Sequence, residues 1–262
     1  KFQADWAVLD GIHGGMNVLP SPRRRIVGKR RAPTEPLRGE DASCFPLRSL
    51  VINLDRRRDR LEGVTARLQD VEAGELLQWE RFAATDGLAD EVPQHDVAQS
   101  WSTDRNSRYD GRAGYGEGFT LRMSPGERGC AMSHVRAWRR TAAGNRPVLI
   151  LEDDAVPAKQ FWKRLKRVIL AAAEQSADAL YLGHIQGAPW RQRLAPGLYE
   201  AEYLWTTVAY VLWPKGAQKL LSLLPVDQPV DNFMAWQMSQ RKFFALAVYP
   251  QMVKQELEWD RG

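Results

Sequence analysis

The chain has 262 residues, of which 44% are hydrophobic and 26% are charged, a composition typical of a globular protein with a substantial core. Its longest apolar stretch in a helix-like segment, 168–173, is too short for a membrane span, which needs about 20 residues. Two cysteines, Cys44 and Cys130, exclude a disulfide framework and a metal finger, so we expect free thiols, with a single bridge as the alternative.

Much of the net charge of +5 comes from one segment near the beginning of the chain, PRRRIVGKRR at 22–31. Residues 1–46 show no sustained helical or strand period, so we predict an irregular basic extension there and a separate domain at 47–262. The basic run is either a solvated arm or a contact for polyanions, including peripheral contact with a membrane. No zinc finger or recognition helix accompanies it, so we do not expect nucleic-acid binding.

The predicted domain begins with a strand followed by a helix. An apolar run at 49–54 (SLVINL) predicts the strand, and the spacing of Leu61, Val64 and Leu68 predicts a helix over 59–69. A second strand at 76–84 leads to a turn at Asp86. The polar, glycine-rich segment 88–122 predicts a loop that is either a flexible lid or disordered.

Strands and helices alternate through the rest of the chain. Ser124, Pro125 and Glu127 together predict a helix start, with a capping box and a proline at the first helical position. The elements expected after it are a strand ending in LILEDD (149–154), a helix at 159–174, strands at 179–183 and 206–213, helices at 215–224 and from Pro229, and a strand at 243–250. This alternation predicts an α/β fold with a mostly parallel central sheet covered by helices on both faces. Ligands of such sheets bind at the carboxyl ends of the strands.

Three consecutive carboxylates at the end of one predicted strand are the strongest functional signal, namely Glu152, Asp153 and Asp154. In an extended chain Glu152 and Asp154 point to one side and Asp153 to the other. A hard divalent cation, manganese or magnesium, would relieve their repulsion and leave coordination positions for phosphate oxygens. The pattern therefore predicts a metal-bridged diphosphate, and an ordinary exposed turn is the alternative. Asn53 and Asp86 fall at strand ends as well.

Motifs that are absent narrow the chemistry further. The sequence contains no GxxxxGK[ST] phosphate loop and no GxSxG nucleophile elbow, and GYGEG at 114–118 is not the dinucleotide fingerprint GxGxxG. An acidic strand end without these loops favours a nucleotide that is held through a metal.

Four segments in chain order resemble glycosyltransferase family 25, which includes bacterial lipopolysaccharide glycosyltransferases and collagen hydroxylysine galactosyltransferases. They are VINLDRRRDRL at 51–61, SPGERGCAMSHVRAW at 124–138, VLILEDDAV at 148–156 and PVDNFM at 229–234. The similarity extends from residue 47 to the end of the chain. Where family members continue with a glutamine and a short SDI-like segment, this chain has Gln255 followed by a different sequence, so the match is partial there.

The resemblance implies a GT-A-like fold, a UDP-sugar donor that is most often UDP-galactose, a divalent metal (Mn²⁺ or Mg²⁺) and inversion at the anomeric carbon. The partners that it implies are the nucleotide-sugar donor and a glycan, lipid-linked sugar or protein acceptor. The cytoplasmic face of a bacterial inner membrane and the lumen of a eukaryotic secretory pathway both fit, so the compartment stays open.

The resemblance also implies roles for single residues. Glu152 and Asp154 match the metal ligands, and Asp231 matches a catalytic base or an acceptor-positioning carboxylate. The donor-binding residues are Asn53, Arg56, Arg60, Asp86, Gly126, Glu127, Ser133, His134 and Asp153. This set agrees with the chemistry, since inverting transfer needs a base for the acceptor hydroxyl and an electrophile for the leaving diphosphate.

Some of these residues have a structural alternative. Asp231 fits a helix N-cap, and His134 fits a satisfied core residue on the helix face that it shares with Cys130. Arg56 and Arg60 fit a solvated helix face equally well.

Three hypotheses for the whole protein follow. The first is a metal-dependent inverting glycosyltransferase, the second is a non-catalytic paralogue that acts by binding or adhesion, and the third is a polyanion-binding protein acting through the basic run at 22–31. The retained cluster of three acids favours the first.

Overall fold

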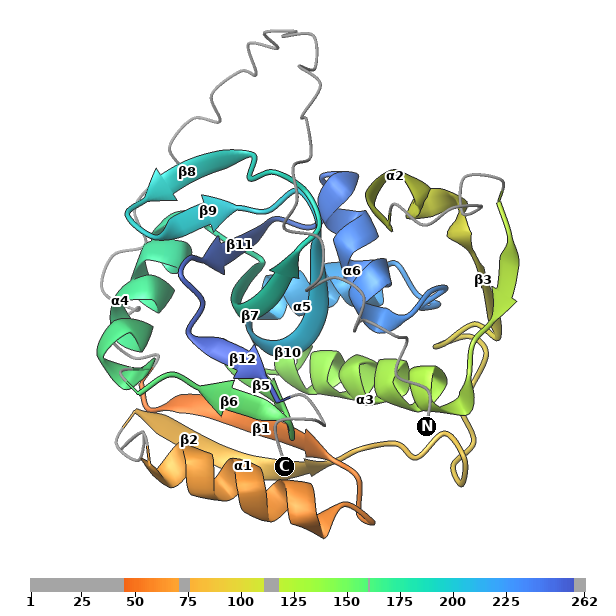
Figure 1. Cartoon of the computed structure of the whole chain (residues 1–262), viewed down its shortest axis with the longest axis horizontal. Coiled ribbons are helices and arrows are strands. Elements are labelled where there is room, and N and C mark those ends of the chain that lie inside the picture. Colours follow the sequence, from red (N-terminus) through yellow and green to blue (C-terminus); the bar gives the residue numbers. More distant parts are fainter. Residues whose placement is uncertain (1–44, 71–75, 111–117, 160, 257–262) are drawn as a thin grey trace, which may run out of the picture. The chain divides into compact units, whose positions relative to one another are not determined.

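The computed structural model describes residues 45–70, 76–110, 118–159 and 161–256 (Figure 1). The predicted extension at 1–46, with its basic run and Cys44, therefore lies almost entirely outside the described residues. None of the described helices is long and apolar enough to cross a membrane. Cys130 is a free thiol, as expected.

An eight-stranded sheet forms the centre of the domain, with the strand order β2-β1-β5-β10-β7-β11-β9-β8. The strands are β1 (Leu47–Asn53), β2 (Leu77–Ala83), β5 (Val148–Glu152), β7 (Ala179–Gln186), β8 (Gln192–Ala195), β9 (Leu198–Glu200), β10 (Leu204–Leu212) and β11 (Ala245–Val248). The pairings make β2, β1, β5, β7, β11 and β8 point one way and β10 and β9 the other, so the sheet is mostly parallel, as predicted.

Helices cover both faces of this sheet, as the alternation predicts (Figure 1). One face carries α1 (Arg58–Asp70) and α4 (Phe161–Glu174), and the other carries α3 (Pro125–Ala142), α5 (Pro214–Leu221) and α6 (Val230–Ser239). Successive side chains of a strand point to opposite faces, so each strand contributes to two cores. In β5, Leu149 and Leu151 pack on the α1/α4 face, whereas Val148 and Ile150 pack on the α3 face.

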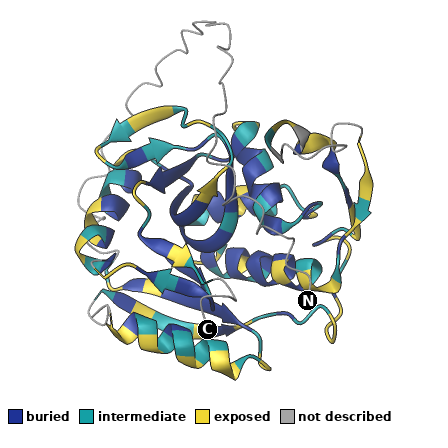
Figure 2. Ribbon diagram, in the orientation of Figure 1, coloured by how far each residue is buried: buried dark blue, intermediate teal, exposed yellow. Residues whose placement is uncertain are grey.

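Burial follows this layered arrangement (Figure 2). The central strands are buried on both faces, and α1 exposes the side that points away from the sheet. Burial on both faces explains why the strands read as nearly continuous apolar runs.

The predicted helix start at Ser124 is confirmed in detail. The Ser124 hydroxyl accepts a hydrogen bond from the backbone N–H of Glu127, and the Glu127 carboxylate accepts one from the N–H of Ser124. Pro125 occupies the first helical turn, so both halves of the capping box are present.

The structure corrects two other expectations. The segment 88–122 is not one irregular loop, because its described residues include β3 (Ser100–Ser102) paired with β4 (Thr120–Arg122), a 3₁₀ helix at Thr103–Arg105 and α2 (Ser107–Asp110). The alternation also missed β8, β9 and a small sheet of β6 (Ala155–Pro157) and β12 (Val253–Gln255). Since β8 and β9, rather than a helix, connect β7 to β10, the chain returns antiparallel and inserts β10 between β5 and β7.

Candidate active site

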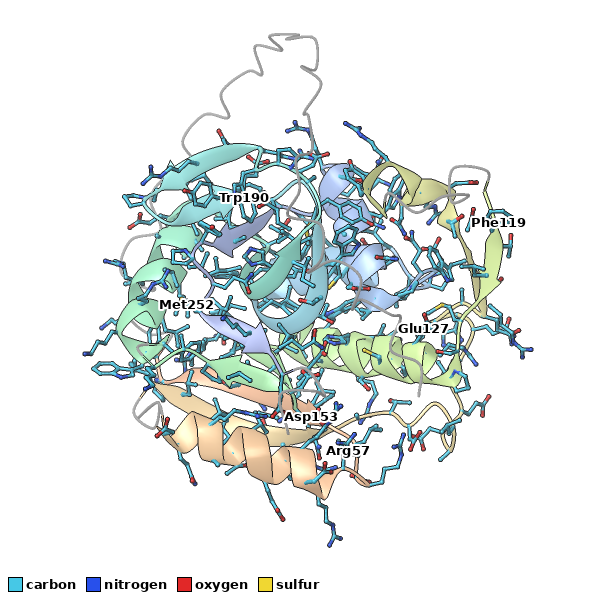
Figure 3. All side chains as sticks on the ribbon, in the orientation of Figure 1. Arg57, Phe119, Glu127, Asp153, Trp190 and Met252 are labelled. Carbon is cyan, nitrogen blue, oxygen red and sulfur yellow. The ribbon has the colours of Figure 1, made fainter. Side chains whose placement is uncertain are left out.

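The carboxyl ends of β1 and β5 bring Asn53 and the three acids together, because these strands are parallel neighbours. The Asn53 Nδ2 donates to Asp153 Oδ2 at 2.8 Å, and Arg60 Nη1 lies 3.1 Å from Asp153 Oδ1. Figure 3 labels Asp153 at this end of the sheet, beside α1. Asp153 is thus a buried carboxylate whose two oxygens both have a donor.

Asp154 has a different environment, although it is the next residue. Its Oδ2 accepts a hydrogen bond from Gln255 Nε2 at 3.1 Å, while its buried Oδ1 has no hydrogen-bond partner. Arg60 lies 3.9 Å away and is already engaged by Asp153. Burial, reinforced by the charge of Glu152, raises the pKa of Asp154 to about 7. Asp154 therefore shares Arg60 with Asp153 and has no cation of its own.

Glu152 is held by two donors on the α3 face of the sheet. Its Oε1 accepts from the Thr207 hydroxyl at 2.5 Å and lies 3.3 Å from His134 Nε2. Burial opposes the charged form, but the hydrogen bonds from His134 and Thr207 outweigh it and hold the pKa of Glu152 below its ordinary value.

The orientation of His134 follows from a chain of buried hydrogen bonds. Trp138 Nε1, which can only donate, bonds the Tyr210 hydroxyl at 2.9 Å, and that hydroxyl lies 2.8 Å from His134 Nδ1. The Tyr210 hydroxyl and the Glu152 carboxylate thus lie at the two ring nitrogens of His134, and His134 Nε2 can donate to Glu152. His134 is fully buried and acts on the site through Glu152.

Asp231 lies in the first turn of α6, where its side chain contacts the backbone of Thr206 in β10. Pro229, not Asp231, is the N-cap of α6, so the capping alternative is wrong. Asp231 Oδ1 accepts from the N–H of Asn232 at 2.8 Å, and its Oδ2 accepts from the N–H of Thr206 at 3.3 Å. Desolvation raises the pKa of Asp231, and the charge of Glu152 adds to this effect.

The other predicted donor-binding residues lie around this centre with partners of their own. Arg56 Nε bonds Asp86 Oδ2 at 2.7 Å on the surface, and this bond lowers the pKa of Asp86. Glu127 completes the capping box, and Ser133 ties α3 to the loop after β2 through the N–H of Thr85 at 2.9 Å.

Gly126 is exposed at the start of α3. Glu127 and Ser133 each have a structural role, Glu127 in the capping box and Ser133 in the bond to Thr85. The contacts of all nine predicted donor-binding residues with a donor, including Asn53, Arg60 and Asp153, stay predictions.

The residues present fit a hard divalent cation. Glu152 and Asp154 offer carboxylate oxygens, and the partnerless Oδ1 of Asp154 is the donor atom that a cation would use. Another group, Cys130, His134 and Glu152, has its potential ligand atoms within 4.8 Å of one another. His134 already uses both ring nitrogens in the buried chain, so we assign no metal to that group.

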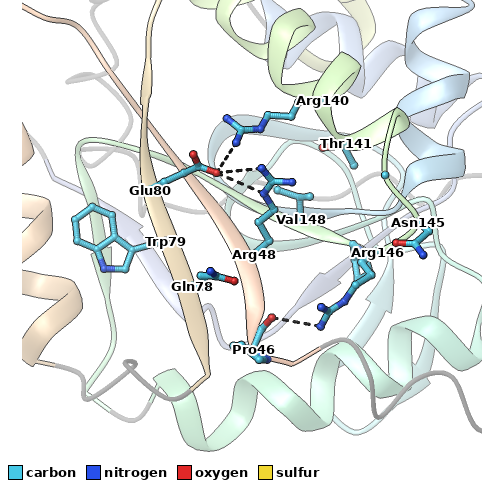
Figure 4. A pocket seen from close by; sticks show the side chains of 12 residues that line it. Pro46, Arg48, Gln78, Trp79, Glu80, Arg140, Thr141, Asn145, Arg146 and Val148 are labelled. Carbon is cyan, nitrogen blue, oxygen red and sulfur yellow. Dashed lines mark hydrogen bonds and ion pairs between the residues drawn. The ribbon is translucent and has the colours of Figure 1, made fainter.

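A separate cavity of about 480 Å³ lies at the opposite, amino end of the strands (Figure 4). Arg48 and Arg140 both bond Glu80 there, and Arg146 donates to the carbonyl of Pro46. It contains none of the residues predicted for catalysis or donor binding. This cavity is therefore not the candidate active site.

Three residues of the site were missed or left without a role by the sequence analysis. Thr207 and Tyr210 lie within a predicted strand, and no sequence signal distinguishes them. Gln255 was noted only as a partial family match, yet its amide contacts Asp154 because β12 pairs with β6 directly after the acids.

Curated proteins with similar sequences include members of one glycosyltransferase family. The chain is 33% identical over 198 residues to "Inactive glycosyltransferase 25 family member 3" of Homo sapiens, an alignment that covers 70% of this chain and 30% of that protein. It is 29% identical over 194 residues to "Procollagen galactosyltransferase 1" of Danio rerio, with 70% and 30% covered. The chain thus spans less than a third of the length of these relatives.

A solved structure of UDP-glucose pyrophosphorylase with UDP-glucose aligns over 76% of this chain and 72% of its own, at a TM-score of 0.37 and 10% identity, too low to assign a ligand. The family model described as "Glycosyltransferase family 25 (LPS biosynthesis protein)" matches residues 47–204, which include Asn53, the capping box and all three acids. The chain belongs to glycosyltransferase family 25.

Proposed function

We propose that this protein is a metal-dependent inverting glycosyltransferase that moves a hexose, galactose, from a UDP-sugar to a hydroxyl acceptor on a glycan, a lipopolysaccharide or a hydroxylysine side chain. The observation that carries the proposal is the pair Glu152 and Asp154, two carboxylates at one strand end, one with a partnerless buried oxygen. Family membership supports the transfer reaction. The name of the relatives called procollagen galactosyltransferases supports galactose.

On the donor side, Glu152 and Asp154 would hold Mn²⁺ or Mg²⁺, which when bound offsets the charge of the leaving diphosphate. Asn53 and Arg60 fix Asp153 at the base of this group. Arg60 also keeps a guanidinium within reach of Asp154, which limits repulsion among the acids.

On the acceptor side, Asp231 takes the proton from the attacking hydroxyl. Two backbone N–H groups orient its carboxylate, and its raised pKa brings it closer to that of an effective general base. The hydroxyl attacks the anomeric carbon from the face opposite the diphosphate, so the new bond forms with inversion.

A non-catalytic paralogue is the second candidate, because several relatives are named inactive family members. Such a protein need not bind a donor through a metal. The presence of Glu152, Asp154 and Asp231 in one site favours the transferase.

Calorimetric titration of UDP and UDP-galactose, with and without Mn²⁺, tests the proposal. We expect binding that depends on Mn²⁺ and that Asp154→Asn weakens at least tenfold, a difference of about 1.4 kcal/mol. Glu80→Gln, the same acid-to-amide change at the amino end of the sheet, is the matched control and should bind normally. Absence of donor binding by the unchanged chain would contradict the transferase and favour the paralogue.

A further inference from the structure

Strand β10 is irregular where it passes the acid cluster. Trp205 pairs with Ile185 of β7, and the next paired residues are Ala209 and Gly183. Three residues of β10, 206–208, therefore stand opposite a single residue of β7, His184. This is a β-bulge, a feature that is common next to active sites because it redirects a side chain.

The bulge changes which face of the sheet Thr207 points to. In a regular strand Thr207 would follow Ala209 and Val211 onto the α1/α4 face. Instead Val208 and Ala209, although consecutive, both pack into the core on that face, while Tyr210 lies on the α3 face. Thr207 is thereby turned to the α3 face, where its hydroxyl donates to Glu152.

The backbone of the bulge has an unusual conformation at Thr206. Its φ angle is 68°, in the left-handed region that β-branched residues rarely adopt. Such conformations persist only where the surrounding structure fixes them, and they cluster at functional sites. Here the N–H of Thr206 donates to Asp231 Oδ2 at 3.3 Å.

We propose that the Thr206–Thr207 bulge is the positioning device of the active site, because it bonds both the metal-side carboxylate Glu152 and the acceptor-side carboxylate Asp231. Thr207 orients Glu152 through its hydroxyl, and the adjacent Thr206 orients Asp231 through its backbone N–H. This inference rests on the proposed function and adds residues to it. Each threonine acts through a carboxylate, so both are positioning residues.

A bulge with only a structural role leads to a different expectation. Substitutions in it would lower stability in proportion to the buried contacts that they remove and would leave metal-dependent donor binding unchanged. Positioning predicts a loss of metal-dependent binding without a matching loss of stability.

Thr207→Val tests the hydroxyl, because valine keeps the shape of threonine and removes the donor. We expect Mn²⁺-dependent UDP binding to weaken at least tenfold, in line with the 10–100-fold effect of groups that orient metal ligands. Thr207→Ser restores a hydroxyl and should bind within about twofold of the unchanged chain. The matched control is Thr141→Val, a buried threonine of α3 whose hydroxyl bonds the carbonyl of Ala137 and which lies at the other end of the sheet.

Thr206→Gly tests the strain of the backbone. Glycine adopts a positive φ without strain, so the urea midpoint should rise if the bulge holds Thr206 in an unfavourable conformation. A lower urea midpoint in this variant would show that the conformation is not strained and would remove that argument for the bulge.

A ligand-free measurement completes the test. A double-mutant cycle of Thr207→Val and Glu152→Ala in urea unfolding should show non-additive effects, because the two side chains are in contact. Unweakened UDP binding by Thr207→Val overturns this inference alone. No UDP binding by the unchanged chain overturns the proposed function as well, and additive effects in the cycle reject the Thr207–Glu152 contact itself.

Discussion

The acid cluster has two sides that differ in how their charge is compensated. On the α1 side, Asp153 has Arg60 and Asn53 as donors, and both of its oxygens are bonded. On the other side, Glu152, Asp154 and Asp231 have no arginine of their own, because Arg60, 3.9 Å from Asp154, is engaged by Asp153, and Asp154 keeps a buried oxygen without a partner. Charge that the protein leaves uncompensated is available to a ligand, so we propose that the cation and the chemistry belong to Glu152, Asp154 and Asp231.

Of the variants that test this comparison, Asp231→Asn should have the largest effect, and the effect should be on the transfer rate. The amide keeps one oxygen for one of the two backbone N–H groups but no longer acts as a base, so we expect the transfer rate to fall by about 10²–10⁴. UDP affinity should stay within about twofold, since this residue lies on the acceptor side. Transfer assays and UDP titration measure the two quantities separately.

The control for this variant is Asp227→Asn, four residues earlier, whose carboxylate pairs with Arg105. It should transfer at the unchanged rate. Equal rates for Asp231→Asn and the unchanged chain would remove Asp231 from the mechanism.

Asp154→Asn should stabilise the metal-free protein in a pH-dependent way. The pKa of Asp154 is raised to about 7 in the folded state, so its contribution to stability is present at low pH and lost as pH rises through about 7. The variant lacks this loss, and its advantage in free energy of unfolding should grow from about pH 4 to about pH 7 and then stay constant.

The advantage should reach at most a few kcal/mol, at about 1.4 kcal/mol per pKa unit. Urea unfolding in the presence of a chelator, at several pH values, measures it. A difference that does not change with pH would mean that Asp154 is ionised normally and needs no cation.

Arg60→Met should destabilise the α1 side. It leaves Asp153, whose side chain is 10% exposed, without its cation, and we expect a loss of about 1–3 kcal/mol in the free energy of unfolding. Arg58→Met, an exposed arginine on the same helix, is the matched control and should change stability little. If the two variants were equally stable, Asp153 would not depend on Arg60, and the two sides of the cluster would not differ.

Much of this arrangement could be predicted from the sequence. Short apolar runs that end in Asn53 and in the acids identified β1 and β5, and the expected parallel sheet brought their carboxyl ends together. The capping residues of α3 fixed its start, and the resemblance pointed to Asp231.

The difference between the two sides could not be predicted, because it depends on register and not on residue type. Asp153 and Asp154 are adjacent and chemically identical, and only the placement of Arg60 and Gln255 distinguishes them. Alternating patterns carry no signal for a bulge, so the position of Thr207 was invisible. Nor did they predict that β10 inserts antiparallel between β5 and β7.

Arg56→Ala should have the smallest effect on stability and decides how far the donor site reaches along the strand ends. The Arg56–Asp86 pair is solvent-exposed, with 55% of the arginine side chain accessible, so its loss should change the free energy of unfolding by less than about 1 kcal/mol. If a diphosphate takes the guanidinium from Asp86, UDP affinity should fall severalfold, and the fall should shrink at high salt. Asp86→Asn tests the same exchange from the other partner. It frees Arg56 from Asp86, while an amide oxygen remains for the N–H of Leu88. Unchanged UDP affinity in Arg56→Ala would confine the donor site to Asn53, Arg60 and the acids.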